Sequence, residues 1–464
     1  MDNRTNEKIK EICINVLRYV LIFIILICVY MSSLILTSLI PSKYMKENVR
    51  VSSEKLFSEG EKVNINLGYK EENIFTFTDA LMINTAYSVD SSTPLKSAML
   101  ARKNYIPGQT STEHIDNQYN LGASEQYVNK KNGDIYQTAE LYGLMHGENI
   151  TESFEYARYW HGYLTVLRPL LVVFSYQAIR VILSIVTTIL LATLSWKLYK
   201  KIGLTTAIIF LLGFMSVNIF IVTKSMNEII VFLIAIIFGI YLLSKKEYSK
   251  NIGVIFFVIG SVTNFFDLLT APLITLAIPT IIYILIQQKN KENLKGNMIA
   301  LIKICILWAI GYGATWLVKW IIVQVLYNRP IITIAIEQAL FRTNGGKVQN
   351  INYKNTVKKN IEGFSRTVIK FFTGLIVIYI LVKLFIIVKK NKKITLLKNI
   401  KQSIPYIFIG ILPFAWYFIL KQHSTIHSFF TYRILCITII SILTIVNKLL
   451  QTQDDFGDGL KNHR

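Results

Sequence analysis

The chain contains repeated apolar runs, and several of them are long enough to cross the hydrocarbon core of a bilayer, which takes about 20 residues. Of its 464 residues, 52% are hydrophobic and only 17% are charged, whereas soluble domains average about 25% charged residues. A backbone inside lipid must satisfy its own hydrogen bonds, so apolar runs of this length fold as helices. The sequence therefore predicts an all-α polytopic membrane protein.

About ten transmembrane helices are predicted, with a large, mainly helical extracytoplasmic segment after the first. The predicted spans cover residues 16–40, 177–199, 204–222, 229–243, 252–266, 273–286, 298–318, 368–387, 406–420 and 429–449. They divide the chain into a cytoplasmic N-terminus with the first span (1–40), an extracytoplasmic segment with juxtamembrane helices (41–176), the remaining spans (177–449) with an outer loop near 328–365, and a cytoplasmic tail (450–464).

Lysine and arginine gather in alternate loops, which sets the predicted orientation. The basic loops include KLYKK, SKKEYSK, QQKNKENLKGN and VKKNKKITLLKNIK, and such loops normally stay in the cytoplasm. Residues 41–166 instead carry 16 acidic and 12 basic side chains by direct count of the sequence. The net charge of +22 therefore reflects topology and anionic lipid at the inner leaflet rather than nucleic-acid binding. We expect a cell-membrane protein with both termini in the cytoplasm and residues 41–166 and 328–365 outside.

The long outer segment is expected to fold without disulfides, because all four cysteines lie in predicted spans or on the inner side. The first span is too long for the apolar part of a signal peptide, and ILTSLIPSKY offers no clear cleavage site, so it is expected to remain as an anchor. Helical spacing predicts helices in VSSEKLFSEG, in TFTDALMINTAYS and across ITESFEYARYWHGYLTVLRPLLVVF, whose 165–175 part would lie along the membrane surface. Residues 104–135 read as loop.

Polar and charged side chains concentrate at the outer ends of the predicted spans, whereas the predicted middle of the bilayer holds almost none. Ion-coupled transporters usually carry such groups near the midplane, so this distribution favours an enzyme that acts on a lipid-linked substrate at the outer face. The candidate site residues are Asp79, Arg158, Trp160, His161, Arg168, Asn264, Asp267, Lys319, Arg342, His423, His427, Tyr432 and Arg433.

Several of these residues also have a simpler structural interpretation. Asp79 could stabilise a helix N-terminus, Asp267 could cap a helix, and Lys319 could extend to the interface. The aromatic residues of YARYWHGYLTVLRPLL are also typical of interfacial anchoring. His423 and His427 are spaced to share a helical face and could bind a metal, but a carboxylate ligand would still be missing. No metal is predicted, and no nucleotide or metal motif implies a cofactor.

The order of these features resembles the GT-C superfamily of integral-membrane glycosyltransferases. The resemblance rests on a first span, a long outer segment with the Thr-Asp pair of TDALMIN, helical segments before the second span, and eight or more further spans. YARYWHGYLTVLRPLL and TNFFDLLTAPLI also resemble segments of multi-pass membrane proteins from low-GC Gram-positive bacteria. The resemblance implies transfer from a polyprenyl-phosphate sugar donor to a glycan or glycolipid acceptor in cell-envelope polysaccharide assembly, with membrane lipids as partners and no nucleic acid.

Such a reaction needs a carboxylate base and cationic groups on the leaving phosphate. Asp79 or Asp267 would be the base, with Glu47, Glu54 and Asp90 as competitors. The phosphate would contact some of Arg158, Arg168, Arg433, His423 and His427. A polysaccharide polymerase or ligase would share this chemistry, and a lipid-linked sugar flippase is the non-enzymatic alternative. An enzyme requires that the candidate residues converge at the outer interface.

Overall fold

The computed structural model describes residues 3–68, 71–105, 137–147, 152–245, 251–344, 351–364, 366–390 and 392–452. Within these ranges, seven helical stretches are long and apolar enough to cross a membrane, which matches the predicted helical membrane architecture. They are Cys13–Ser38 of α1 (Asn3–Ser38), α7 (Tyr176–Lys201), α10 (Met226–Ser244), α13 (Leu294–Tyr327), Val368–Lys389 of α16 (Arg366–Lys389), α17 (Leu396–Ile419) and Ser428–Leu449, which comprises α19 (Ser428–Thr431), η3 (Tyr432–Leu435) and α20 (Cys436–Leu449).

Three of the ten predicted spans fall on shorter apolar helices: α8 (Leu204–Ser216), α11 (Ile252–Phe266) and α12 (Leu273–Lys289). These contain 13, 15 and 17 residues, fewer than the roughly 20 of a typical span. The predicted span 204–222 is interrupted because Asn218 adopts a left-handed φ of 53°, which asparagine tolerates better than most residues. The short helix α9 (Ile219–Val222) begins directly after it.

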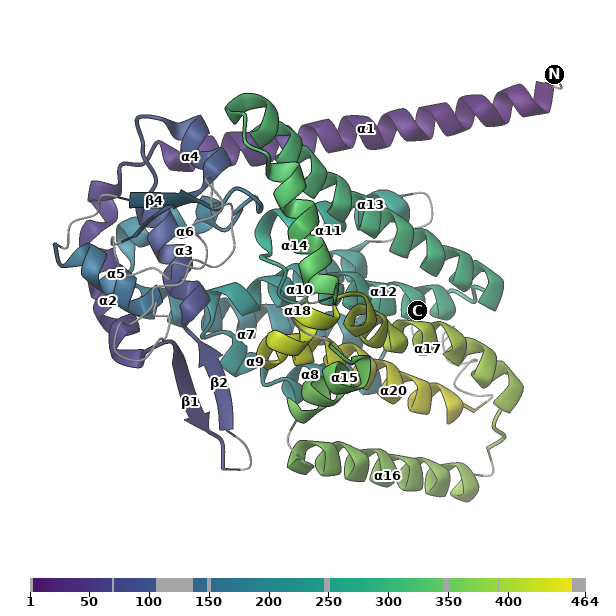
Figure 1. Ribbon diagram of the computed structural model, residues 1–464. Helices are drawn as coiled ribbons and strands as arrows, with labels where there is room; N and C mark the ends of the chain where they lie inside the picture. The colour runs from purple at the N-terminus through teal and green to yellow at the C-terminus, as the bar shows by residue number, and fades with distance from the viewer. Residues whose placement is uncertain are drawn as a thin grey trace.

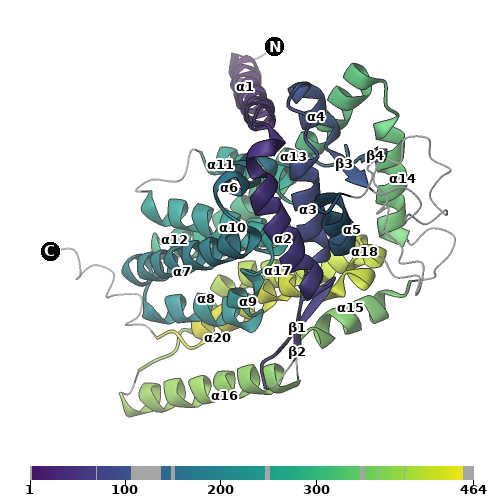
Figure 2. The same ribbon diagram turned by 90° about the vertical axis from the view of Figure 1, so that its left-hand side faces the viewer.

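The described residues between 42 and 173 form a separate layer at one end of the helix bundle, called here the N-terminal layer; it faces the viewer in Figure 2. The predicted helices at 51–60 and 76–88 are present as α2 and α3. Two small antiparallel strand pairs, which the sequence did not predict, join β1 to β2 and β3 to β4. The layer comprises η1 (Ser42–Met45), α2 (Lys46–Glu59), β1 (Lys62–Asn66), β2 (Glu71–Phe75), α3 (Phe77–Tyr87), α4 (Pro94–Leu100), β3 (Arg102–Tyr105), α5 (Gln137–Met145), β4 (Glu152–Glu155) and α6 (Leu164–Val173).

The predicted helix across residues 150–174 is wrong in its first half. Residues 152–155 form β4, a turn follows, and only α6 is helical. His161 takes a left-handed φ of 55°, which interrupts a helix, and its Nε2 donates to the Tyr156 carbonyl at 2.6 Å. Gly162 donates to the Phe265 carbonyl at 2.8 Å, and a Cβ there would overlap with Phe265. The turn therefore folds directly over the end of α11. The predicted loop at 104–135 lies almost entirely outside the described residues.

The predicted outer loop at 328–365 contains two helices, α14 (Ile331–Asn344) and α15 (Tyr353–Glu362). In Figure 1, α14 runs across the bundle toward α18 (Lys421–Ile426). Helix α14 packs against α18. This contact brings α14 next to the segment that connects α17 with α20.

The described parts of the basic segments that end α7, α10 and α12 lie together at the opposite end of the bundle from the N-terminal layer (Figure 1). The Lys201 ammonium donates to the carbonyls of Leu243 and Lys245 at 3.1 and 2.7 Å, and the Lys289 ammonium donates to the Lys201 carbonyl at 2.7 Å. We call this end the basic end. The ends of α7, α10 and α12 therefore lie together there, as the alternation of basic loops predicts.

Two helices present mainly apolar side chains outward. Only 11% of the apolar window of α1 and 6% of that of α16 is buried, and α16 lies at the edge of the bundle in both views, with α20 as a main contact (Figures 1 and 2). Exposed apolar helix faces of this extent suit a lipid environment rather than water.

Candidate functional site

Two polar clusters lie buried or partly buried at the end of the bundle that carries the N-terminal layer. The first, called here the basic cluster, consists of Arg158, Arg342, His423, His427 and Asp267. The second, called the carboxylate triad, consists of the two carboxylates Glu72 and Glu228 and of Arg433, which pairs with both.

In the basic cluster, α14 carries Arg342 to the α18 segment. The Arg342 Nη1 lies 2.6 Å from His423 Nδ1, and His423 Nε2 lies 3.0 Å from the Leu269 carbonyl oxygen. Because a carbonyl can only accept, Nε2 must carry the proton and Nδ1 must accept from the arginine. Burial, followed by the positive charge of Arg342, holds the pKa of His423 well below its ordinary value. His423 is therefore a neutral histidine that orients Arg342.

His427 lies beside this pair, with its ring stacked on Phe430 at 5.2 Å and 4.8 Å from the His423 ring. Its Nδ1 is buried without a hydrogen-bond partner. Burial, with a smaller contribution from Arg342, lowers the pKa of His427 to about 4. A neutral imidazole with an unused nitrogen can serve a ligand as either donor or acceptor, depending on its tautomer.

Arg158 reaches the cluster from the turn that precedes α6. Its guanidinium lies 5.7 Å from the centre of the Tyr159 ring and interacts with Tyr156 and, repulsively, with Arg342. Only 5% of the residue is exposed, and burial lowers the pKa of Arg158 from its ordinary value. Two like charges gathered in a buried region favour an anionic ligand between them.

Asp267 supplies the carboxylate of the basic cluster. It ends α11, and both of its oxygens accept from the Thr270 backbone N–H, at 3.0 and 3.1 Å, while the Thr270 hydroxyl also donates to it. The side chain is buried, and burial raises the pKa of Asp267 to about 6 despite these hydrogen bonds. A carboxyl with a pKa near neutrality is suited to accept a proton and release it again.

Metal binding has little support in this arrangement. Across the described ranges, no group of three or more His, Cys, Asp or Glu side chains could hold a metal ion. Both nitrogens of His423 are already engaged, by Arg342 and Leu269.

Asp79 lies elsewhere, at the N-terminus of α10. Its carboxylate accepts from the backbone N–H groups of Met226 and Asn227 at 3.0 and 3.1 Å and from the Tyr176 hydroxyl at 2.7 Å. Burial raises the pKa of Asp79, whereas the helix N-terminus favours its charged form. These contacts give Asp79 a structural role in fixing α10 against the N-terminal layer.

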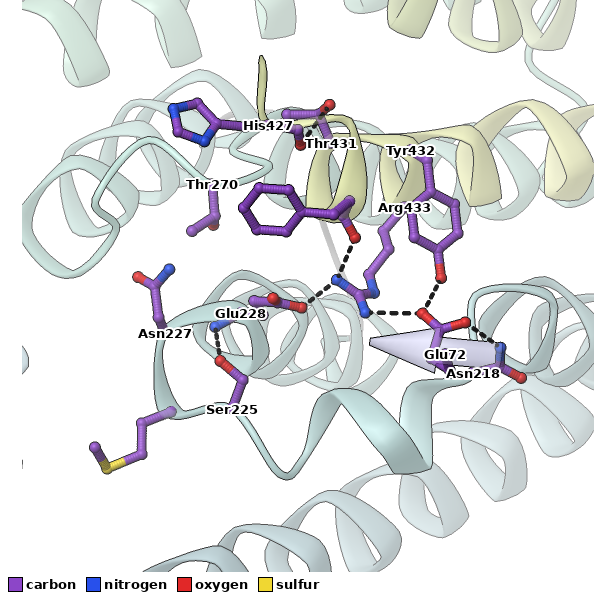
Figure 3. Close-up of polar contacts among 12 residues, drawn as sticks. Glu72, Asn218, Ser225, Asn227, Glu228, Thr270, His427, Thr431, Tyr432 and Arg433 are labelled. Atoms are coloured by element: carbon purple, nitrogen blue, oxygen red, sulfur yellow. Dashed lines mark hydrogen bonds and ion pairs between the residues drawn. The ribbon is translucent and has the colours of Figure 1, made fainter. Parts of the chain in front are cut away.

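The carboxylate triad joins three distant parts of the chain. Arg433 pairs with Glu228 of α10 and, at 3.1 Å, with Glu72 of β2. Glu72 also accepts from the Tyr432 hydroxyl at 2.6 Å and from Asn218 at 3.1 Å. Figure 3 shows the Arg433 guanidinium between the two carboxylates. All three side chains are at most 5% exposed, so the triad ties the β1–β2 pair to the bundle core.

Most of the other candidates hold helix ends or pack between elements. Arg168 donates to carbonyls at the ends of α1 and α3, namely those of Thr37, Ile40 and Ala86. Lys319 donates to the Met99 carbonyl at the end of α4 at 2.7 Å. These cations satisfy carbonyl groups that helix C-termini leave without partners.

Trp160 and His161 belong to the turn above α11. The Trp160 indole donates to the Thr315 carbonyl at 2.7 Å, and His161 Nδ1 lies 3.0 Å from the Tyr163 hydroxyl. Burial lowers the pKa of His161 to about 3, so it is neutral and shapes the turn that positions Arg158. Asn264 lies on α11 near Tyr312, beside the basic cluster.

The competing acids lie outside both clusters. Glu47 and Glu54 pair with Arg50 along α2. Asp90 accepts from Ser92 and Thr93 in an exposed turn.

Thus the structure gathers Arg158, Asp267, Arg342, His423 and His427, whereas Asp79 bonds Tyr176 and the N-terminus of α10, and Tyr432 and Arg433 bond Glu72 and Glu228. Sequence reasoning missed Glu72 and Glu228. The sequence SMNE, starting at Ser225, has the Ser-x-x-Glu pattern of a capping box, and the Ser225 hydroxyl does accept from the Glu228 N–H at 3.4 Å. The Glu228 carboxylate instead turns to Arg433, and only tertiary contact reveals this.

No protein-family model matches the chain, and no curated protein or solved structure is significantly similar to it.

Proposed function

We propose that this protein is a GT-C-like membrane glycosyltransferase that moves a sugar from a polyprenyl-phosphate donor to a hydroxyl of a glycan or glycolipid acceptor. In this proposal the ten predicted spans cross the cell membrane of a bacterium, both termini are cytoplasmic, and the basic cluster lies on the extracytoplasmic side. The product would belong to a cell-envelope or surface polysaccharide.

The observation that carries the proposal is the basic cluster itself. It places two arginines, two neutral histidines and one carboxylate together next to helices of membrane-spanning length. Arg158, Asp267 and His423 are buried, and Arg342 and His427 are partly buried. Arginine binds phosphate oxygens through a planar pair of donors, and the arginines here outnumber the carboxylate. This excess of positive charge suits a negatively charged, lipid-linked substrate.

Each residue then has a role in the reaction. Arg158 and Arg342 would bind the phosphate, and His423 would hold Arg342 in place through its Nδ1. Asp267 would take the proton of the acceptor hydroxyl while the new bond forms from that oxygen to the anomeric carbon. The bond from the anomeric carbon to the phosphate oxygen breaks, and the charge that develops on the leaving polyprenyl phosphate is stabilised by the arginines.

The test is sugar transfer in proteoliposomes that contain polyprenyl-phosphate sugars and a glycolipid acceptor. Asp267→Asn should lower turnover about 10²–10⁴-fold, the usual contribution of base catalysis, without loss of folded protein. Asp90→Asn is the matched control, since Asp90 lies in an exposed turn, and it should leave turnover unchanged.

Absence of transfer by the intact protein with every donor of this class would overturn the proposal. Passage of a lipid-linked sugar across the bilayer without a new glycosidic bond would assign a flippase instead. Transfer of whole lipid-linked chains would assign a polymerase or ligase.

A further inference from the structure

Three uncharged polar side chains lie together where α11 contacts α13: Asn264 of α11, and Tyr312 and Trp316 of α13. Asn264 faces the Tyr312 hydroxyl, and the Tyr312 and Trp316 rings meet edge to face with centroids 5.3 Å apart. Asn264 is 1% exposed and Tyr312 is 8% exposed. We refer to these three residues as the neutral trio.

The polar atoms of the neutral trio are poorly satisfied within the protein. Neither heteroatom of the Asn264 carboxamide, nor the Tyr312 hydroxyl, nor the Trp316 indole nitrogen makes a hydrogen bond of normal geometry. Asn264 and Tyr312 lie within reach of a weak hydrogen bond to each other, but their contact falls outside normal hydrogen-bond geometry. Buried polar groups in proteins are almost always hydrogen-bonded, so these atoms are available for a ligand.

A tight backbone contact joins the two helices that carry the trio. Gly260 and Gly311 lie so close to the backbones of Trp308 and Phe257 that a Cβ at either glycine would overlap with them. Asn264 follows Gly260 by one helical turn, and Tyr312 follows Gly311 directly. The tight helix contact therefore holds the two side chains at fixed positions.

The neutral trio adjoins the basic cluster. The Tyr312 hydroxyl interacts electrostatically with Asp267 and Arg342. The Trp316 ring lies 6.0 Å from the Tyr159 ring, over which Arg158 is placed. A ligand with its phosphate on Arg158 and Arg342 would therefore have its adjacent group next to Asn264, Tyr312 and Trp316.

We infer that Asn264, Tyr312 and Trp316 form a subsite for the hydroxyl groups of an uncharged sugar ring. Sugar hydroxyls both donate and accept, which matches a carboxamide, a phenol and an indole N–H. The inference rests on the proposed function and adds the part of the donor that this subsite recognises.

Binding of two probes separates the sugar from the phosphate. One probe is a short isoprenyl phosphate, and the other is the same lipid phosphate carrying a neutral hexose or N-acetylhexosamine, each tested for affinity by thermal shift. In the unmodified protein the sugar should tighten binding by at least about tenfold, since each hydrogen bond contributes about 2- to 12-fold.

Asn264→Leu and Tyr312→Phe should lose most of this sugar-dependent gain and keep the affinity for the sugarless probe. Arg342→Gln should weaken both probes. Tyr283→Phe, in which the removed hydroxyl lies on α12 and bonds Gln287, is the matched control and should change neither affinity.

Thermal stability without ligand gives an independent result. Because Asn264 is buried with unsatisfied atoms, Asn264→Leu should keep or raise the melting temperature. A lower melting temperature together with an unchanged sugar gain would show a structural role and overturn the inference. Equal affinity of the unmodified protein for both probes would also overturn it while leaving the phosphate site intact. Failure to bind either probe would overturn the proposed function, and the subsite with it.

Discussion

At residue scale, Asp79 is surrounded by donors, and this determines how it should respond to mutation. Asp79→Asn would place an amide N–H₂ among the N–H groups of Met226 and Asn227, which already donate to it. We expect a loss of about 1–3 kcal/mol in the free energy of unfolding, measured by thermal denaturation, and normal turnover per folded molecule. Loss of turnover at unchanged stability would instead assign the base to Asp79.

The proposed role of Asp267 as the catalytic base predicts how turnover depends on pH. Burial raises the pKa of Asp267 to about 6, and a base must be deprotonated, so turnover should rise as the pH increases through about 6 and be lost below it. The Thr270 hydroxyl donates to the carboxylate and lowers this pKa. Thr270→Val should therefore move this rise in turnover to higher pH without abolishing turnover. An unchanged pH dependence in this variant would contradict Asp267 as the titrating group.

The raised pKa of Asp267 also affects the stability of the fold. This effect falls as the pH rises, whereas turnover should increase. The folded-state pKa of Asp267 lies above the model-peptide value, so between roughly pH 4 and 6 the folded state holds the proton more tightly than the unfolded chain. This contribution favours folding at low pH and declines as the pH rises through about 6.

Removing the charge of Arg433 leaves two buried carboxylates facing each other. Arg433→Met should cost about 3–5 kcal/mol, the usual result of breaking a buried ion pair on one side. Adding Glu72→Gln and Glu228→Gln to Arg433→Met should recover much of the loss, because the orphaned charges are removed. Thermal unfolding of the single and triple variants measures both effects, and equal stability of the two would show that the triad is not electrostatically coupled.

Sequence reasoning at this scale found the residue types of the basic cluster but not their grouping. Arg158, Asp267, Arg342, His423 and His427 stood out because each is polar at the end of an apolar run. Asp79 and Arg433 stood out for the same reason, yet their partners are amides of α10 and the carboxylates Glu72 and Glu228. Nothing in local spacing distinguishes a charge that a distant residue neutralises from one that awaits a ligand.

At the scale of elements, the contact between α11 and α13 depends on glycine. Gly311→Val would drive its side chain into the Phe257 backbone, which cannot rotate away. We expect a loss of at least about 1–3 kcal/mol in stability, as for overpacked cores, and weaker binding at the adjoining site. Gly313→Ala is the matched control, because nothing lies within 4 Å of that position. It should raise stability slightly through helix propensity, and equal thermal stability of Gly311→Val and the unmodified protein would contradict this account.

Elements were predictable where one physical signal dominated. Long apolar runs predicted α1, α7, α10, α13, α16 and α17, because burial in lipid demands helix. The strands of the β1–β2 and β3–β4 pairs have too few residues for a clear alternation, and β3 and β4 also lie far apart in sequence. The turn before α6 was mistaken for helix because its aromatic residues suit either conformation, and a contact with Phe265 decides between them.

At the scale of the whole molecule, the meeting of the basic loops at one end predicts a labelling pattern. With the four native cysteines replaced, Ser58→Cys in α2 and a cysteine at position 120 should react with an impermeant thiol reagent added to intact cells. A cysteine at position 395 should react only after permeabilisation. Protection of position 120 in intact cells, or reaction of position 395, would reverse or refute the proposed orientation.

The length of α13 also has a consequence for substrate choice. Its 34 residues span roughly 50 Å at about 1.5 Å per residue, whereas the hydrocarbon core measures roughly 30 Å. The surplus of several helical turns carries Lys319 and Trp320, which bond the N-terminal layer, so one helix fixes the distance of that layer from the opposite end of the bundle. Under the proposed function, a lipid-linked substrate would have to bridge a set distance between its tail and its reacting atom. A protein of this function would then select substrates by the length of the linkage between tail and head as well as by the chemistry of either.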